Sequence, residues 1–155
     1  MIIRKCLQKD YYLVNSLLKE NMDLHQKELP HIFKTNDIII TDQEYTNKIN
    51  NTDLIMYLAE DTEGIKGLII CKLKNPSSHK LLNQRRIGFI TDLIITEKSK
   101  RKGIGKLLFR KLKEELKLKN IEYIELTVWG FNKDAMDFYK KLGMDEISNT
   151  LSMKI

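Results

Sequence analysis

The chain has 155 residues, of which 42% are hydrophobic and 31% are charged, and its formal net charge at pH 7 is +6. This length suits one globular domain with a sizeable core, and no window approaches the roughly 18 consecutive apolar residues of a membrane span. The first residues lack the pattern of a secretory signal. We therefore expect a single domain over residues 1–155 that is cytoplasmic and has no membrane partner.

The positive charge is concentrated in one segment. Residues 98–119 contain ten Lys or Arg and two Glu, a local net charge of +8, whereas residues 20–61 contain nine acidic residues and three lysines, a net charge of −6. A nucleic-acid binder would combine such a basic helix with aromatic side chains among the cations, and Phe109 is the only aromatic residue of the segment. We therefore expect no nucleic-acid partner and look for a smaller anionic ligand.

The first half of the chain is predicted to begin with a strand and a helix. A short strand at Ile2–Arg4 precedes a helix that starts near Asp10, carries apolar residues at helical spacing and ends at Pro30. The following residues mix apolar and polar runs, which we interpret as a loop and then a short helix from Asp42.

Three strands are predicted next. The runs 53–61 and 65–75 are rich in β-formers and are separated by a turn that contains Gly64, which indicates a hairpin. A third long strand over residues 85–96 follows a polar loop. Consecutive strands of this kind favour an antiparallel meander.

The second half is predicted to alternate helix and strand. Ile104, Leu108, Leu112 and Leu116 recur every four residues, as on the buried face of a helix. A strand over 121–129 follows, then a helix over 132–143 with Asn132 as its N-cap, and residues 145–155 are most simply a last short strand or hairpin. The strand-helix-strand order implies some parallel pairing, so we predict an α/β (α+β) domain.

The cysteines and histidines carry little chemistry in this pattern. Cys6 and Cys71 both fall in or beside predicted strands, so we interpret them as buried reduced thiols rather than as a disulfide or a nucleophile. The three histidines do not have the spacing of metal ligands, so we expect no metal and interpret them as surface or loop residues: His25, His31 and His79.

Residues 98–106 have the features of an anion site. Gly103 and Gly105 leave backbone N–H groups accessible at the start of a predicted helix, where the helix dipole adds positive charge. Cations surround them: Lys98, Lys100, Arg101, Lys102 and Lys106. A phosphate group is the candidate ligand, and a solvated basic helix is the alternative. The spacing fits neither the dinucleotide fingerprint nor a P-loop.

Two motifs resemble those of the GNAT superfamily of acetyl-CoA-dependent N-acetyltransferases. The run "KRKGIG" at 100–105 is similar to the acyl-CoA-binding loop, with Lys100 where the family has Arg or Gln, and "NKDAMDFYKKLGM" at 132–144 is similar to a second family block. The resemblance includes the strand "FITDLIIT" between residues 89 and 96. It implies a GNAT-like mixed, mostly antiparallel central β-sheet flanked by helices.

The resemblance also implies roles for individual residues in transfer from acetyl-CoA to a primary amine, without a covalent enzyme intermediate. The strand backbone would pair with the pantetheine arm at Leu93, Ile94 and Ile95. The pyrophosphate would be held by Lys100, Arg101, Lys102, Gly103, Ile104, Gly105 and Lys106. Asn132 would touch the cofactor arm, and Tyr139 would contact the cofactor and protonate the departing thiolate. The alternative for Tyr139 is a half-buried core aromatic residue, and Asn132 can be a plain helix cap as well as a contact to the cofactor.

The residue that accepts the proton of the amine does not follow from the motifs. Relatives carry Glu where this chain has Thr91 or Thr127, so Asp92 is the candidate, with Glu125 behind it. A purely structural carboxylate is the alternative for Asp92. The missing Glu positions also leave open a non-catalytic acyl-CoA-binding module.

The acceptor pocket of the family is built from N-terminal helices and nearby loops. There this chain carries Glu20, Asp23, Glu28 and Asp37, which predict a small cationic amine or a peptide or protein amine as acceptor. A solvated acidic face is the alternative for these residues. Family members often pair, so a homodimer is compatible with the resemblance.

Overall fold

The computed structural model describes residues 1–34 and 36–155. The strands of this part form one sheet in the order β1-β2-β3-β4-β5. The strands and α-helices of the chain, in sequence order, are β1 (Ile2–Lys5), α1 (Tyr11–Glu28), α2 (Asp42–Ile49), β2 (Leu54–Asp61), β3 (Gly64–Lys74), β4 (Ile87–Ile95), α3 (Ile104–Leu118), β5 (Tyr123–Leu126) and α4 (Lys133–Lys141). Neighbouring strands from β1 to β4 are antiparallel, and β4 and β5 are parallel. The predicted fold class is confirmed.

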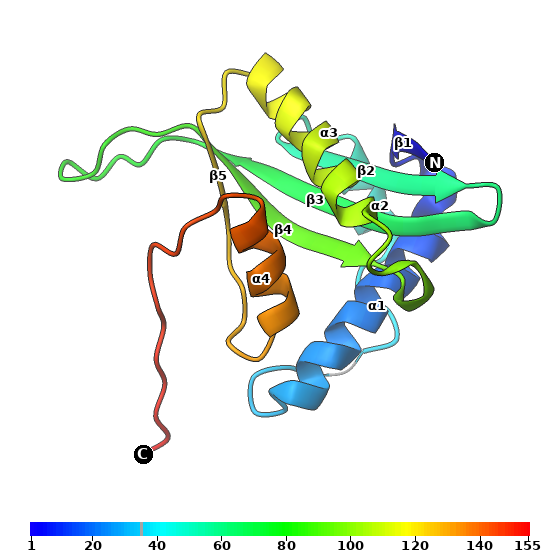
Figure 1. The fold of residues 1–155 in the computed structure, drawn as a ribbon, viewed down its shortest axis with the longest axis horizontal. Helices are drawn as coiled ribbons and strands as arrows, with labels where there is room; N and C mark the ends of the chain where they lie inside the picture. Colours follow the sequence, from blue (N-terminus) through cyan, green and yellow to red (C-terminus); the bar gives the residue numbers. More distant parts are fainter. Residues whose placement is uncertain (35) are drawn as a thin grey trace.

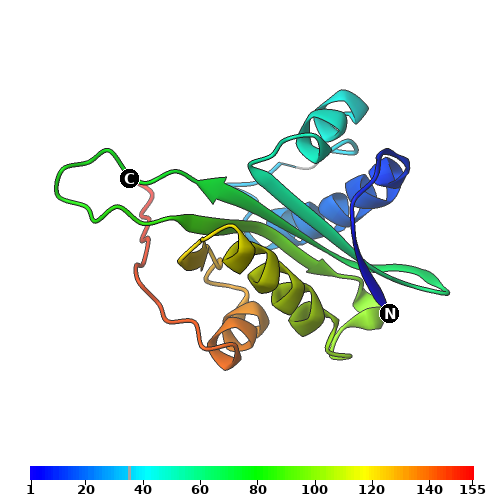
Figure 2. The same ribbon diagram turned by 90° about the horizontal axis from the view of Figure 1, so that it is seen from above.

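The helices cover both faces of the sheet. Helices α1 and α2 lie on one face, and α3 and α4 lie on the other (Figures 1 and 2). Strand β3 is buried on both sides, because Leu68 and Ile70 pack toward α1 and α2 whereas Ile69 and Cys71 pack toward α3. This two-sided burial explains why the strand is a continuous apolar run.

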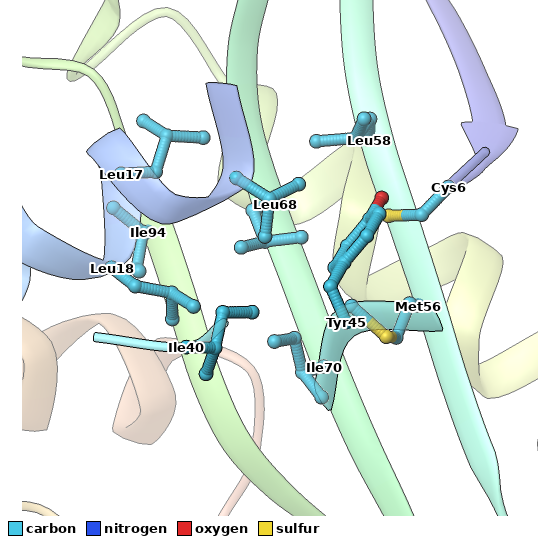
Figure 3. Packing of buried hydrophobic residues seen from close by; sticks show 11 residues of the cluster. Cys6, Leu17, Leu18, Ile40, Tyr45, Met56, Leu58, Leu68, Ile70 and Ile94 are labelled. Atoms are coloured by element: carbon cyan, nitrogen blue, oxygen red, sulfur yellow. The ribbon is translucent and has the colours of Figure 1, made fainter. Parts of the chain in front are cut away.

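The core under α1 and α2 is centred on Tyr45, which is fully buried. Its ring lies beside Met56 with its hydroxyl next to Cys6 (Figure 3), and that hydroxyl donates to the carbonyl oxygen of Leu7 at 2.9 Å. Helix α2 begins with a capping box in which the side chains of Thr41 and Glu44 each accept from the other's backbone N–H. Local and tertiary contacts therefore fix the short helix predicted from Asp42.

A buried ion pair fastens β1 to the start of α1. Asp10 is 2% exposed, and both of its oxygens accept hydrogen bonds from the Arg4 guanidinium, at 2.6 and 2.9 Å. Arg4 also donates to Glu60 on β2 at 2.6 Å. Burial opposes ionisation of Asp10, but the hydrogen bonds from Arg4 and from the Leu7 N–H outweigh it and lower the pKa of this carboxyl.

Strands β4 and β5 pair over only part of their length. The pairing runs from Ile87 with Tyr123 to Ile90 with Leu126, whereas β4 continues along β3 to Ile95. Thr91 is an extra residue in the β3–β4 ladder, where the register jumps from Ile90 to Asp92, and such a bulge bends a strand. The chain after β5 runs away from the end of β4 (Figure 1), so the two strands diverge beyond the bulge.

Most predicted elements are present, with two differences. The predicted strand 121–129 is shorter, because β5 ends at Leu126 where β4 diverges from it. The prediction of a last strand or hairpin over 145–155 is wrong, since no residue there is in a strand. Leu151 and Met153 are 93% and 83% exposed, and a strand so far from the sheet has neither a pairing partner nor a core to cover.

The two thiols agree with the sequence analysis. Cys6 and Cys71 are both buried and free, and they belong to cores on opposite faces of the sheet. Within the described ranges, no helix is long and apolar enough to cross a membrane.

Candidate active site

The divergence of β4 from β5 leaves one edge of β4 without a neighbouring strand. Beyond Ile90, the described residues offer no pairing partner on that side for Leu93, Ile94 or Ile95. The side chain of Ile94 packs under α1, and those of Leu93 and Ile95 pack against the core under α3. Because the side chains are anchored on both faces, the edge offers its backbone N–H and C=O groups to an extended ligand.

The segment of residues 98–106, called the glycine loop below, connects β4 to the first turn of α3. Gly103 is the N-cap of α3 with φ +80°, a left-handed conformation that favours glycine, and a Cβ placed there would meet nothing within 4 Å. No side chain caps the helix, so its first N–H groups are open to an anion. Ile104 is buried and anchors the first turn.

The cations of the loop are exposed. Lys100 pairs with Glu97, whereas the other loop cations form no ion pair with any described residue: Lys98, Arg101, Lys102 and Lys106. Arg101 has φ +59°, which is uncommon for a residue with a side chain. The loop thus gathers uncompensated positive charge around the open start of α3.

The loop is in contact with α4. A Cβ on Gly105 would lie 3.1 Å from the ring of Phe138, so the absence of a side chain lets α4 approach α3 closely. At the start of α4 the Asn132 side chain accepts from the N–H of Ala135 at 3.1 Å, which confirms the predicted N-cap. The contact places Tyr139, the residue after Phe138, on a helix held against the glycine loop.

Tyr139 and Asp92 interact electrostatically across the divergence. Burial raises the pKa of the Tyr139 phenol, and the negative charge of Asp92 raises it further. Burial also raises the pKa of Asp92, while the Thr91 side chain and then the charges of Lys48 and His25 act in the opposite direction. Asp92 of β4 is thus within electrostatic reach of Lys48 from α2, His25 from α1 and Tyr139 from α4.

Asp92 lies in the wall of a pocket of about 470 Å³ on the face of the sheet covered by α1 and α2. The apolar part of the pocket lining includes Leu18, Ile40 and Ile70. Its polar lining consists of Asn21, Asn47, Lys48, Asn51, Lys72 and Asp92, with Thr91 of the bulge. A pocket lined by apolar side chains and a few polar groups is the usual form of a small-molecule site.

The other carboxylates that the sequence analysis singled out do not line this pocket. Oε1 of Glu125 is 2.7 Å from the Arg85 guanidinium, in a geometry that makes no hydrogen bond, so this charge is already paired. Asp23 pairs with Lys19 at 2.8 Å, and Asp37 lies 3.9 Å from the same ammonium. Glu20 and Glu28 are exposed.

The acidic residues from which the sequence analysis predicted a cationic acceptor, Glu20, Asp23, Glu28 and Asp37, are all absent from the lining of this pocket. Asp23 and Asp37 share Lys19 at the surface. The net charge of a sequence segment therefore does not give the charge of the pocket that it surrounds.

His25 is the residue that the sequence analysis undervalued. Its Nδ1 donates to the carbonyl oxygen of Asn21 at 2.7 Å, since a carbonyl only accepts. The ring contacts Phe33, Trp129 and Phe131 edge-on, with centroids 5.2 to 6.3 Å apart. Trp129 and Phe131 are distant in sequence, so no local pattern could have revealed this position.

Metal ligation has no support in residues 1–34 and 36–155, where no three His, Cys, Asp or Glu side chains gather as a metal site would require. The other two histidines, His31 and His79, lie in exposed loop segments, as predicted.

Comparison with known proteins agrees with this geometry. Residues 17–144 match the profile of the acetyltransferase (GNAT) family. The chain is 32% identical over 99 residues to N-alpha-acetyltransferase 30 from Xenopus laevis, which is 64% of this chain and 34% of that protein. The match thus spans about a third of the length of this curated relative.

Solved structures share the fold. The tetramutant of the BH1408 protein from Bacillus halodurans has a TM-score of 0.94 at 28% identity and covers 100% of both chains. An acetyltransferase from Vibrio fischeri has a TM-score of 0.67 at 22% identity and covers 83% of this chain and 97% of its own. The second likeness concerns the fold alone.

Proposed function

Because the chain belongs to the acetyltransferase (GNAT) family, we propose that it transfers the acetyl group of acetyl-CoA to a primary amine of a small molecule or peptide, directly and without a covalent enzyme intermediate. The observation that carries this proposal is the electrostatic influence of Asp92 on Tyr139, two residues on elements beside the divergence of β4 and β5 and near the open glycine loop. A base and an acid within reach of one substrate are what acyl transfer to an amine requires.

Binding of acetyl-CoA is assigned to the loop and the free strand edge. The first N–H groups of α3 and the cations Lys102 and Lys106 suit a pyrophosphate. The edge of β4 at residues 93–95 suits an extended pantetheine arm, because its backbone groups lack a strand partner among the described residues. Asn132 already caps α4, and it would touch the arm with the remaining capacity of its amide.

The reaction forms a C–N bond to the acceptor and breaks a C–S bond. Acetyl-CoA, when bound, supplies the acetyl group as a thioester. The raised pKa of Asp92 suits a carboxylate that takes the proton leaving the acceptor nitrogen. The raised pKa of Tyr139 keeps its phenol protonated at neutral pH, so that the phenol can donate its own hydroxyl proton to the departing sulfur.

The test combines two measurements on the whole chain. Calorimetry with acetyl-CoA reports binding, and thiol release with a panel of primary amines, checked by product mass, reports transfer. We expect both. Binding without turnover of any amine would instead identify an acyl-CoA-binding module, and the absence of binding would contradict both readings.

A further inference from the structure

The pocket beside Asp92 carries more positive than negative charge. Lys48 of α2 and Lys72 of β3 line it together with the single carboxylate of Asp92. Neither ammonium forms an ion pair within 4 Å in the described residues, where the pairs present involve other lysines and arginines. Lys72 stands on the same side of β3 as Leu68 and Ile70, which are four and two residues away. Both cations are therefore available to a ligand.

Two amides of the pocket, Asn47 and Asn51, can add hydrogen-bond donors. The side-chain oxygen of Asn47 accepts from Gln43 Nε2 at 3.1 Å, and that of Asn51 accepts from the backbone N–H of Asp53 at 2.8 Å. Their NH₂ groups donate to no side chain or backbone group in the described residues, so both are free to donate to a ligand. Two ammonium groups and two amide donors in one pocket are complementary to an oxyanion.

Ion pairing with Asp92 does not account for the presence of Lys48 and Lys72 in the pocket. Lys48 is near enough for its charge to lower the pKa of that carboxyl against the effect of burial, yet the two groups form no ion pair. The pocket of about 470 Å³ therefore separates a carboxylate, suited to an amine, from cations suited to an anion.

We propose, on the basis of the proposed acetyltransferase function, that the acceptor is an amine that also carries an anionic group, a carboxylate or a phosphate, which Lys48 and Lys72 bind while the amino nitrogen faces Asp92. The sequence analysis predicted a cationic acceptor, and this inference reverses the charge of the group that the pocket recognises. A polyamine would place a second cation against two lysines, which is unfavourable.

The experiment compares matched acceptors in the acetyl-CoA-dependent assay. Phosphoethanolamine is paired with ethanolamine, β-alanine with β-alanine amide, and putrescine serves as the cationic amine. We expect kcat/KM to be at least tenfold higher for one anionic member than for its neutral partner, and putrescine to be the poorest acceptor. The preferred pair distinguishes a phosphate from a carboxylate.

The lysines are tested by Lys48→Gln and Lys72→Gln. Each should raise KM for the preferred anionic acceptor roughly tenfold or more, as expected for a lost charged hydrogen bond, and change KM for the neutral partner by a much smaller factor. Lys80→Gln, in the exposed loop before β4, removes the same charge elsewhere and should change neither. The anionic acceptor should also raise the Tm of the wild type, and this shift should be smaller in both pocket variants.

The outcomes separate the two proposals. Acetylation of neutral or cationic amines as well as anionic ones, or insensitivity of KM to both lysine variants, would overturn this inference and leave the acetyltransferase intact. If no amine is acetylated and the anionic amines cause no shift in Tm, the inference is overturned together with the proposed function.

Discussion

The negative charge of Asp92 acts on the phenol of Tyr139, although the two residues come from β4 and α4. The negative charge of Asp92 is one of the two causes that raise the pKa of Tyr139, after burial. When Asp92 takes up a proton, that contribution disappears and the phenol becomes more acidic. A proton arriving at the proposed base therefore makes the proposed acid a better donor.

The first prediction concerns Tyr139. Tyr139→Phe keeps the ring that packs beside Phe138 and removes only the hydroxyl. We expect kcat to fall by roughly 10²–10⁴-fold, the usual contribution of a positioned general acid, while calorimetry finds acetyl-CoA affinity unchanged. Tyr12→Phe, at a position that is 81% exposed, is the control and should have full activity. A variant at 139 with the wild-type rate at every pH would show that the hydroxyl is not the acid.

The second prediction sets activity against stability at Asp92. Burial holds the pKa of this carboxyl above its ordinary value, so the folded state retains the proton more tightly than the unfolded state. Its contribution to stability is complete below the unfolded pKa of about 4 and is lost as the pH rises through the folded pKa. Asp92→Asn should therefore raise the Tm at pH 7 while lowering kcat roughly 100-fold or more.

The pH profile tests the same residue independently. The wild-type rate should rise with pH as Asp92 loses its proton, at a pH above the ordinary aspartate range. This limb should be missing from whatever activity Asp92→Asn retains. A variant that is less stable than the wild type, or that keeps the same acid limb, would contradict the assignment.

The third prediction concerns the glycine loop. Gly103→Ala forces a side chain into the left-handed region at φ +80°, at a cost of about 1–2 kcal/mol, and tilts the N–H groups assigned to the pyrophosphate. We expect acetyl-CoA affinity to fall roughly tenfold by calorimetry. Gly64→Ala at φ +114° in the β2–β3 turn is similarly strained and should lower the Tm without changing that affinity. Equal losses of affinity in both variants would mean that the effect is a general one.

The fourth prediction concerns the ion pair under β1. Arg4→Met leaves Asp10 buried and unpaired, which should destabilise the fold by roughly 3–5 kcal/mol. Because hydrogen bonds lower the pKa of Asp10, its stabilising contribution is present above about pH 4 and is lost as the pH falls through the folded pKa. Urea unfolding of the wild type at pH 7 and in mild acid measures this loss. Lys19→Met, which breaks a surface pair with Asp23, should change the stability little.

The fifth prediction concerns the two thiols. Burial raises the pKa of Cys6 and of Cys71 to about 12, so neither forms the reactive thiolate near neutral pH. A thiol-specific disulfide reagent should label neither cysteine in the folded protein and both after denaturation. Fast labelling of the native protein would show that one core opens readily, and it would also add a background to thiol-release assays.

Much of the fold is encoded locally and could be read from the sequence. The four-residue recurrence from Ile104 to Leu116 predicted the buried face of α3, and all four positions are buried. The side-chain cap at Asn132 is likewise a local signal, and it is present in the structure. Such features depend on residues within one or two turns of each other, so tertiary structure has little opportunity to override them.

The site was predictable only in part, because its pieces meet through long-range packing. The glycine loop has a linear motif, whereas the pocket needs Lys48 from α2, Lys72 from β3 and Asp92 from β4 in one place. The register of the sheet decides which side chains share that face. Alternating strand residues gave no sign that Thr91 is an extra residue, and the bulge there displaces every later residue of β4 relative to β3.

The short pairing of β4 with β5 has a consequence for how the molecule opens. Four residue pairs join β5 to the sheet, and the segment that follows, α4 included, relies on contacts with the α3 core. Amide hydrogens of this C-terminal portion should exchange with solvent before those of β2 and β3. A molecule bound along the unused edge of β4 would contact both the sheet and the C-terminal portion, so its binding should slow amide exchange in that portion by mass action.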